Sequence, residues 1–310
     1  MKLGFLYAGQ GSQTPGMGRD FYEAFPAFRA VYDGADPGFD LKAVSFTGEG
    51  LNETAYTQPC MVAFAAGVTA LLFAEGVRPA LAAGLSLGEY SALHAAGVWD
   101  APTAVSLAAF RGRAMTEAAR GVDSAMIAVL ALDREKLQEA CDRASSLGVV
   151  QIANYNCPGQ LVIGGERAAV EQAAAYAKEL GARRAMPLNT SGPFHTRLLE
   201  PASRALHDYF QTIPFGPMAF PVVFNCLGTT MGPGDTVPAL LERQVMSSVY
   251  MEDSLRFMAR AGVDTFVEIG PGKVLSGFVR KTVDGAKTYS ITTVQDLEAV
   301  LADLKGAAPC

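Results

Sequence analysis

The sequence predicts an α/β protein in which a mainly parallel sheet is covered by helices. Short apolar runs alternate with longer segments of helical periodicity, and the runs are expected to form strands at residues 3–7, 80–83, 222–225 and 265–269. The chain has 310 residues, 50% of them hydrophobic, so it is able to bury a sizeable core. This composition excludes a disordered chain.

A different rhythm in the middle of the chain predicts an inserted domain. Between residues 123 and 189 the order is strand, helix, strand, strand, helix, strand, which is the ferredoxin-like pattern. We expect these strands at 126–130, 149–153, 161–164 and 185–188, and the helices at 133–144 and 166–180. The α/β rhythm then returns with a helix over about 197–210. Residues 1–122 and 190–310 are therefore expected to form one large domain, with residues 123–189 inserted into it.

Charge and hydropathy argue against two classes of partner. The formal net charge is -6, and nucleic-acid affinity depends mostly on lysine and arginine, so we expect no nucleic acid. The longest apolar stretch, residues 61–74, is interrupted by Thr69 and closed by Glu75. A membrane helix needs roughly 20 apolar residues, so this stretch predicts a buried helix and no membrane span. The first residues lack the pattern of a secretory signal, and we expect a cytoplasmic protein.

Cysteine spacing and glycine motifs argue against metals and nucleotide cofactors. Gly9-x-Gly11 is followed by Thr14 where a dinucleotide fingerprint needs glycine, and Gly272-Lys273 lacks the flanking residues of a P-loop. We therefore expect no cofactor and no metal. The cysteines form no C-x-x-C pair, which indicates reduced thiols at Cys60, Cys141, Cys157, Cys226 and Cys310.

A candidate nucleophile lies in Gly84-Leu85-Ser86-Leu87-Gly88, a G-x-S-x-G segment. The segment follows the expected strand at 80–83 and opens a helix, which is the strand-turn-helix context of a nucleophile elbow. Small flanking residues let the strand and the helix approach each other while the serine hydroxyl points outward. On this pentapeptide alone, a glycine-rich helix start with Ser86 as its cap explains the residues equally well.

The chain offers three histidines as a base for a serine nucleophile. His94 follows Ser86 by eight residues on the same expected helix, which places it about 12 Å along the axis and out of reach. His207 lies in an amphipathic segment typical of a solvated surface. His195 lies between a Gly-Pro pair and a helix, where loops commonly present catalytic groups. Elimination favours His195, and the alternative is a helix-entry residue bonded to its own backbone.

The helix expected over residues 102–119 carries a charged side chain on its apolar side. A buried guanidinium needs an anionic partner, and a carboxylate provides two parallel hydrogen bonds. A carboxylate of the substrate and an internal Asp or Glu are both open as that partner. Helical spacing places Arg111 on one side with Ala104, Leu107, Ala108 and Met115.

Together these residues resemble the malonyl-CoA:acyl carrier protein transacylases, and the resemblance spans essentially the whole chain. The order and spacing of the motifs are highly specific. The motifs are Gly9-Gln10-Gly11-Ser12-Gln13, Thr57-Gln58-Pro59, Ser86-Leu87-Gly88-Glu89-Tyr90-Ser91-Ala92, Arg111-Gly112, Asn156-Cys157-Pro158-Gly159-Gln160, Phe194-His195, Arg243-Gln244 and Glu268-Ile269-Gly270-Pro271-Gly272-Lys273-Val274-Leu275.

The resemblance implies a catalytic role for five residues. Ser86 is acylated, and His195 acts as general base and general acid. The main-chain carbonyl of Gln244 orients His195, and that fixes the imidazole tautomer. The backbone N–H groups of Gln10 and Leu87 form the oxyanion hole, where preorganised donors stabilise developing negative charge.

The resemblance also implies how the substrate is bound. Arg111 holds the free carboxylate of the malonyl group, and Gln58 lines the pocket. From the bulk of Phe194 beside His195 we also expect little room at the α-carbon, which would favour malonyl over methylmalonyl. One position departs from the family pattern, because Leu85 stands where a histidine commonly precedes the nucleophile. We expect this change to affect elbow stability or rate without removing activity, because proton transfer is assigned to His195.

The implied reaction is a ping-pong S-malonyl transfer. Malonyl passes from malonyl-CoA to Ser86, CoA leaves, and the phosphopantetheine thiol of holo acyl carrier protein takes the acyl group for fatty-acid chain extension. The elbow and the Ser-before-His order are shared with the α/β-hydrolases, so we expect an α/β-hydrolase-like large domain. We further expect a monomer whose basic patch receives the acidic carrier protein, with contributions from Lys273, Arg280, Lys281, Arg183 and Arg184.

Two alternative functions leave features of the sequence unexplained. A serine hydrolase of the lipase or esterase type shares the elbow, but it explains neither Arg111 nor the motifs around Gln10 and Gln244. A non-catalytic module that binds CoA or carrier protein has only Leu85 in its favour. The presence of the candidate nucleophile, base and arginine argues against it.

Overall fold

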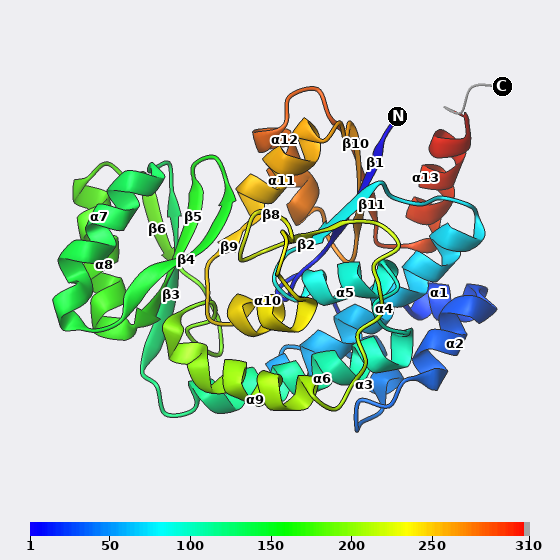
Figure 1. The fold of residues 1–310 in the computed structure, drawn as a ribbon, viewed down its shortest axis with the longest axis horizontal. Coiled ribbons are helices and arrows are strands. Elements are labelled where there is room, and N and C mark those ends of the chain that lie inside the picture. The colour runs from blue at the N-terminus through cyan, green and yellow to red at the C-terminus, as the bar shows by residue number, and fades with distance from the viewer. Residues whose placement is uncertain (307–310) are drawn as a thin grey trace. The chain divides into compact units, whose positions relative to one another are not determined.

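The computed structural model describes residues 1–306, which form two compact units (Figure 1). The first unit consists of Met1–Gly112, Phe215–Val223 and the described residues from Met258 onward. The second consists of Arg113–Pro214 and Phe224–Phe257. The predicted insert at 123–189 lies wholly within the second unit. Four of the five cysteines are buried thiols, and Cys310 lies outside the described residues.

The first unit contains a parallel sheet, as the sequence predicts. Its strands lie in the order β11-β10-β1-β2-β7, and each neighbouring pair is parallel. Residues along β1, β2 and β10 are buried almost without interruption, as expected for a parallel sheet that is covered on both faces. The strands are β1 (Leu3–Tyr7), β2 (Leu81–Gly84), β7 (Val222–Phe224), β10 (Thr265–Ile269) and β11 (Lys287–Ile291).

Helices of the first unit pack against this sheet and against one another. The helix α5 packs on β1 and β2, and α12 packs on β10 and β11. Two helices, α6 (Ala101–Ala119) and α11 (Met251–Arg260), begin in one unit and end in the other. The remaining helices are α1 (Arg19–Ala24), α2 (Pro26–Gly34), α3 (Leu41–Thr47), α4 (Thr54–Ala74), α5 (Gly88–Ala95), α12 (Val274–Thr282) and α13 (Val294–Gly306).

The apolar helix α4 is a core helix. Its length and composition would suffice for a membrane span, but 83% of its apolar window is buried in the structure. It is longer than the apolar run at 61–74 because about two partly polar turns, from Thr54 onward, precede that run. The prediction of a buried helix is confirmed.

A buried carboxylate holds α12 on the sheet. Glu268, at the end of β10, is fully buried and accepts the backbone N–H groups of Leu275 at 2.9 Å and Ser276 at 2.7 Å. These N–H groups belong to the first turn of α12, where a helix has no internal acceptors and where negative charge is favourable. This contact explains why the motif that begins at Glu268 ends in a helix.

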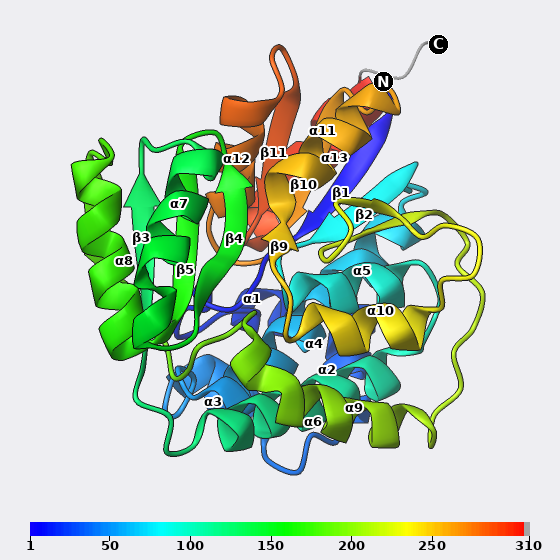
Figure 2. The same cartoon turned by 60° about the vertical axis from the view of Figure 1, so that its left-hand side comes forward.

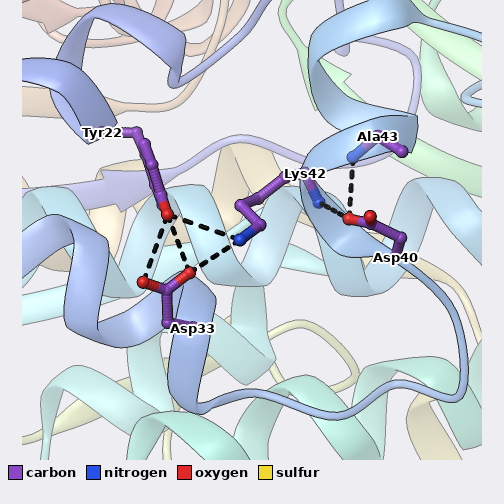
Figure 3. Close-up of polar contacts among 5 residues, drawn as sticks. All are labelled: Tyr22, Asp33, Asp40, Lys42 and Ala43. Atoms are coloured by element: carbon purple, nitrogen blue, oxygen red, sulfur yellow. Dashed lines mark hydrogen bonds and ion pairs between the residues drawn. The ribbon is translucent and has the colours of Figure 1, made fainter.

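Polar side chains join the short helices near the N-terminus (Figure 3). The carboxylate of Asp33 accepts from Lys42 Nζ at 3.0 Å and from the Tyr22 hydroxyl at 2.9 Å, and these bonds hold the pKa of Asp33 below its usual value. Asp40 caps α3 by accepting the N–H groups of Lys42 and Ala43, both at 3.0 Å. Because these groups are exposed, we expect their hydrogen bonds to order the short helices locally and to contribute little to the free energy of unfolding.

The second unit is built on an antiparallel sheet with two helices. The elements follow one another as strand, helix, strand, strand, helix, strand, as predicted, and the strands lie in the order β6-β3-β5-β4. The two helices lie side by side against one face of the sheet (Figure 2), over a shared apolar core. The elements are β3 (Ser124–Leu130), α7 (Arg134–Ala144), β4 (Val150–Cys157), β5 (Gln160–Glu166), α8 (Arg167–Glu179) and β6 (Arg184–Pro187).

Residues 224–257 belong to the same unit because part of this segment pairs with the edge of that sheet. The short strand β9 (Val249–Tyr250) pairs in parallel with β4, and the rings of Tyr155 and Tyr250 stack with centroids 4.9 Å apart. Arg134, in the first turn of α7, pairs with Glu252 at 3.0 Å and with Asp253 at 2.9 Å. The unit also contains α9 (Glu200–Phe210), β8 (Thr229–Thr230), α10 (Val237–Gln244) and single turns at Ser145–Leu147 and Arg197–Leu199.

Candidate functional site

The candidate nucleophile sits on a sharp turn between β2 and α5. Ser86 has a φ of 52°, in the left-handed region that residues with a side chain seldom adopt. Two backbone hydrogen bonds hold the turn. The N–H of Leu85 donates to the carbonyl of Tyr7 at 3.0 Å, and the N–H of Glu89 donates to the carbonyl of Ser86 at 3.1 Å. This is the strand-turn-helix geometry expected of an elbow.

Three glycines allow the backbones around this turn to touch. A methyl group on Gly84 would lie 1.9 Å from the carbonyl carbon of Gly88, and one on Gly88 would lie 2.1 Å from the carbonyl oxygen of Tyr7. A methyl group on Gly9 would lie 2.4 Å from the carbonyl oxygen of Leu85. The loop after β1 is therefore packed directly on the elbow.

Arg111 is 1% exposed, and its neighbours on the same side of α6 are buried, as the spacing predicts. Its partners include the side-chain carbonyl of Gln58, 2.9 Å from Nη1, and the hydroxyl of Ser86, 3.1 Å from Nη2. The guanidinium carbon also lies 5.2 Å from the ring centre of Tyr90. Burial lowers the pKa of Arg111, whereas Tyr90 and Glu89 raise it. Arginine still remains charged at neutral pH, so a buried cation lies beside the candidate nucleophile.

Gln10 is joined to Arg111 through Gln58, and Leu87 directly follows the nucleophile. The side-chain carbonyl of Gln10 accepts from Gln58 Nε2 at 3.4 Å, and its amide nitrogen donates to the Thr54 hydroxyl at 2.9 Å. Leu87 is buried and is the N-cap residue of α5, directly after Ser86. Ser86, Arg111, Gln58 and Gln10 thus form one hydrogen-bonded group in the first unit.

The candidate base and its carbonyl partner lie in the second unit. His195 is 3% exposed, and its Nδ1 lies 2.9 Å from the main-chain oxygen of Gln244. A carbonyl oxygen only accepts, so Nδ1 carries the proton and Nε2 is the ring atom able to take one. Gln244 is the last residue of α10, so its carbonyl accepts no hydrogen bond from an N–H group within the helix. The pairing implied by the resemblance is present in the structure.

Gln151 binds the backbone around His195. His195 has a φ of 60°. The Gln151 side chain on β4 accepts the N–H of Arg197 at 3.1 Å and donates to the carbonyl of His195 at 3.5 Å. The Thr196 hydroxyl donates to the carbonyl of Pro193 at 2.6 Å. A single glutamine on a strand belongs to no motif, so no sequence signal pointed to it.

Phe194 is 8% exposed and packs beside a glycine that makes room for it. A methyl group on Gly192 would lie 2.5 Å from the side chain of Ala119 and 3.2 Å from the ring of Phe194. Gly192 therefore has a packing reason in addition to its effect on the loop.

The other two histidines occupy the places that the sequence predicts. His94 bonds through Nδ1 to the carbonyl of Trp99 at 2.9 Å, and burial lowers its pKa. The His207 side chain is 57% exposed and lies 3.1 Å from Glu242. Among residues 1–306, no group of three or more His, Cys, Asp and Glu side chains is placed to hold a metal ion.

Comparison with known proteins identifies the family. Residues 4–301 match the family model described as "Acyl transferase domain". The chain is 40% identical over 309 residues to the malonyl CoA-acyl carrier protein transacylase of Bacillus subtilis, with 98% of each chain covered. The chain belongs to the acyl transferase family of malonyl CoA-acyl carrier protein transacylases.

Solved structures of family members share its fold. A malonyl CoA-acyl carrier protein transacylase from Clostridium perfringens is 38% identical with a TM-score of 0.95, and the match covers 99% of this chain and 98% of that one. A malonyl-transacylase in complex with a holo type II PKS acyl-carrier protein is 35% identical with a TM-score of 0.93, and the match covers 98% of this chain and 100% of that one. The α/β fold with a parallel and an antiparallel sheet is thus the family's fold.

The glycine contacts at the elbow predict the effect of one methyl group. Gly84→Ala places a methyl against the backbone of Gly88, which is unable to move without displacing α5. We expect the free energy of unfolding to fall by about 3 kcal/mol or more, the upper range for an overpacked core. Chemical denaturation measures the change.

Gly34→Ala is the matched control for this prediction. Gly34 ends α2 with no atom within 4 Å of the added methyl, so we expect a change within about 1 kcal/mol. A Gly84→Ala protein as stable as the wild type would contradict the close approach of strand and helix.

Proposed function

We propose that this chain transfers malonyl from malonyl-CoA to the phosphopantetheine thiol of acyl carrier protein through a malonyl-Ser86 intermediate. The observation that carries the proposal is the buried Arg111 guanidinium, 3.1 Å from the hydroxyl of Ser86. In a malonyl thioester, a single methylene group separates the carboxylate from the reacting carbonyl. A fixed cation beside the nucleophile is therefore suited to this acyl group and has no use in a simple esterase.

The proposed first half-reaction acylates the enzyme. Ser86 Oγ attacks the thioester carbonyl while Nε2 of His195 takes the hydroxyl proton, and the N–H groups of Gln10 and Leu87 stabilise the oxyanion. The C–S bond then breaks, and the CoA sulfur leaves with the proton from the imidazolium. The Gln244 carbonyl keeps Nδ1 protonated throughout, which supports this direction of proton transfer.

The second half-reaction repeats these steps with another thiol. The phosphopantetheine thiol gives its proton to His195 Nε2 and attacks the malonyl ester, and Ser86 recovers its proton as the ester bond breaks. One thioester is thus exchanged for another, with no cofactor required by the chemistry. In this scheme Gln58 and Phe194 line the acyl pocket, and Phe194 disfavours a substituent on the α-carbon.

Several features support the finer assignments in this proposal. The antiparallel order β6-β3-β5-β4 with two helices on one face supports a ferredoxin-like insert at 123–189. The parallel sheet with its serine elbow supports an α/β-hydrolase-like fold for the first unit. We assign the acceptor to fatty-acid synthesis and the enzyme to the cytoplasm as a monomer. Type II polyketide carrier protein is the alternative acceptor, because a relative was solved with one.

Intact-mass spectrometry tests the proposed reaction. Incubation with malonyl-CoA should add one malonyl group, and holo acyl carrier protein should remove it. Acetyl-CoA and methylmalonyl-CoA should label more slowly, because acetyl-CoA lacks the carboxylate that Arg111 binds and methylmalonyl-CoA carries an α-methyl group that Phe194 disfavours. Ser86→Ala should form no adduct, because the nucleophile is missing.

Each other outcome of that experiment points to a different function. Rapid release of free malonate without an adduct would favour a hydrolase. Binding of malonyl-CoA with neither adduct nor turnover would favour a non-catalytic module. Either result would refute malonyl transfer.

We further propose that exposed basic residues receive the acidic carrier protein. Lys273, Arg280 and Lys281 are exposed in the first unit, and Arg183 and Arg184 are exposed in the second. The double variant Arg280→Glu/Lys281→Glu should lower kcat/KM for carrier protein by at least about 10-fold at low salt, since opposite charges steer association. The rate of adduct formation from malonyl-CoA should not change.

Lys136→Glu/Lys178→Glu is the matched control for the basic residues. Both lysines are exposed on α7 and α8, and the variant makes the same change in net charge outside the proposed patch. Equal losses of carrier-protein transfer in the two double variants, or a loss that salt does not reduce, would contradict a local docking patch.

A further inference from the structure

Five side chains of the first unit form a series of hydrogen bonds that runs from Ser86 to Thr54. Arg111 Nη1 donates to Gln58 Oε1 at 2.9 Å, Gln58 Nε2 donates to Gln10 Oε1 at 3.4 Å, and Gln10 Nε2 donates to Thr54 Oγ1 at 2.9 Å. At the other end, Arg111 Nη2 donates to Ser86 Oγ at 3.1 Å. The nucleophile is thus connected to the first residue of α4.

The guanidinium dictates the direction of every bond in this series. Arginine only donates, so Gln58 must turn its carbonyl toward Arg111 and its amide nitrogen toward Gln10. Gln10 in turn must present its carbonyl to Gln58, which leaves its amide nitrogen to donate. The group that receives this last donor must be an acceptor, and the Thr54 hydroxyl is one.

Thr54 is itself held firmly in place. It is 3% exposed, and Gln58 follows it by one helical turn on the same face of α4. A methyl group on Gly112 would lie 2.7 Å from the carbonyl oxygen of Thr54. Gly112 directly follows Arg111 on α6, so this helix touches the backbone of Thr54. The contact holds Arg111 and Thr54 in place relative to each other.

We propose that Thr54 is a positioning residue whose hydroxyl holds Gln10, one of the two proposed donors of the oxyanion hole. This inference rests on the proposed function, in which the N–H of Gln10 stabilises the oxyanion. By holding the side chain of Gln10, Thr54 fixes the rotation of the residue whose N–H must face the reacting carbonyl. Since the oxyanion forms with any thioester, loss of the hydroxyl slows acylation by malonyl-CoA and acetyl-CoA alike. Carboxylate recognition by Arg111 is affected less.

The test compares Thr54→Val with Thr54→Ser in single-turnover acylation. Valine keeps the shape of threonine without the hydroxyl, and serine keeps the hydroxyl. We expect Thr54→Val to slow acylation by about 10-fold for both acyl-CoAs, less than the roughly 100-fold or greater loss caused by deleting an oxyanion donor. The KM for malonyl-CoA should stay within about 3-fold of wild type, and Thr54→Ser should restore the rate.

Thr57→Val is the control for losing a buried hydroxyl on the same helix. Its hydroxyl donates to the carbonyls of Leu51 and Glu53, outside the series that leads to Arg111. It should lower the midpoint of thermal unfolding but leave the acylation rate near that of wild type. If Thr54→Val fails to fold, Gln10→Met removes the other partner of the same bond, keeps the backbone N–H and should show the same rate loss.

Three results would overturn this inference. They are an unimpaired Thr54→Val protein, a Thr54→Ser protein as slow as Thr54→Val, and a Thr57→Val protein as slow as either. Each of them leaves malonyl transfer by the wild type intact and so refutes only the role of Thr54. A wild-type protein that forms no malonyl adduct refutes the proposed function and this inference together.

Discussion

A buried positive charge determines how the residues around the nucleophile are arranged. An isolated guanidinium inside a protein costs several kcal/mol, so its surroundings must supply acceptors. Gln58 and Ser86 both accept from Arg111, and the ring of Tyr90 lies beside the guanidinium. Neither of these two acceptors bears a full negative charge, and the buried carboxylate of Glu89 raises the pKa of Arg111. In the proposed reaction, a substrate carboxylate gains more from this position than an uncharged acyl group does.

The elbow places the nucleophile at this cation through contacts between backbones. Gly84 and Gly88 let β2, α5 and β1 approach more closely than any side chain would allow. The close approach leaves Ser86 with a left-handed φ, and such conformations persist only where the surrounding structure enforces them. The positions of Ser86 and Arg111 therefore follow from the parallel sheet and the helices packed on it.

The sequence predicted the elements with strong local signals and missed those that depend on distant contacts. Apolar runs located β1 and β10, and helical spacing placed Arg111 on a buried face. The place of residues 224–257 in the second unit was not predictable, because β9 has only two residues and Arg134 lies over a hundred positions from Asp253. A strand that short has no periodicity, and an ion pair leaves no pattern in the sequence.

In the candidate site, too, some residues have a local sequence signal and others depend on distant contacts. Chemistry and elimination single out the serine, the histidine and the arginine as candidates. Their roles and the Gln244 carbonyl came only from family resemblance, because any residue type carries a carbonyl. Thr54 and Gln151 belong to no pattern that chemistry singles out. Their parts in holding Gln10 and the backbone of His195 emerge only from three-dimensional contacts.

Calorimetric binding to the Ser86→Ala protein tests the central claim most directly, because this variant binds acyl-CoA without reacting. If Arg111 binds the malonyl carboxylate, malonyl-CoA should bind at least about 10-fold more tightly than acetyl-CoA, in line with roughly 1.5–3 kcal/mol for hydrogen bonds to charged groups. The preference should disappear in Ser86→Ala/Arg111→Ala. Equal affinity for the two acyl-CoAs in Ser86→Ala, or a preference that survives the loss of Arg111, would contradict the account.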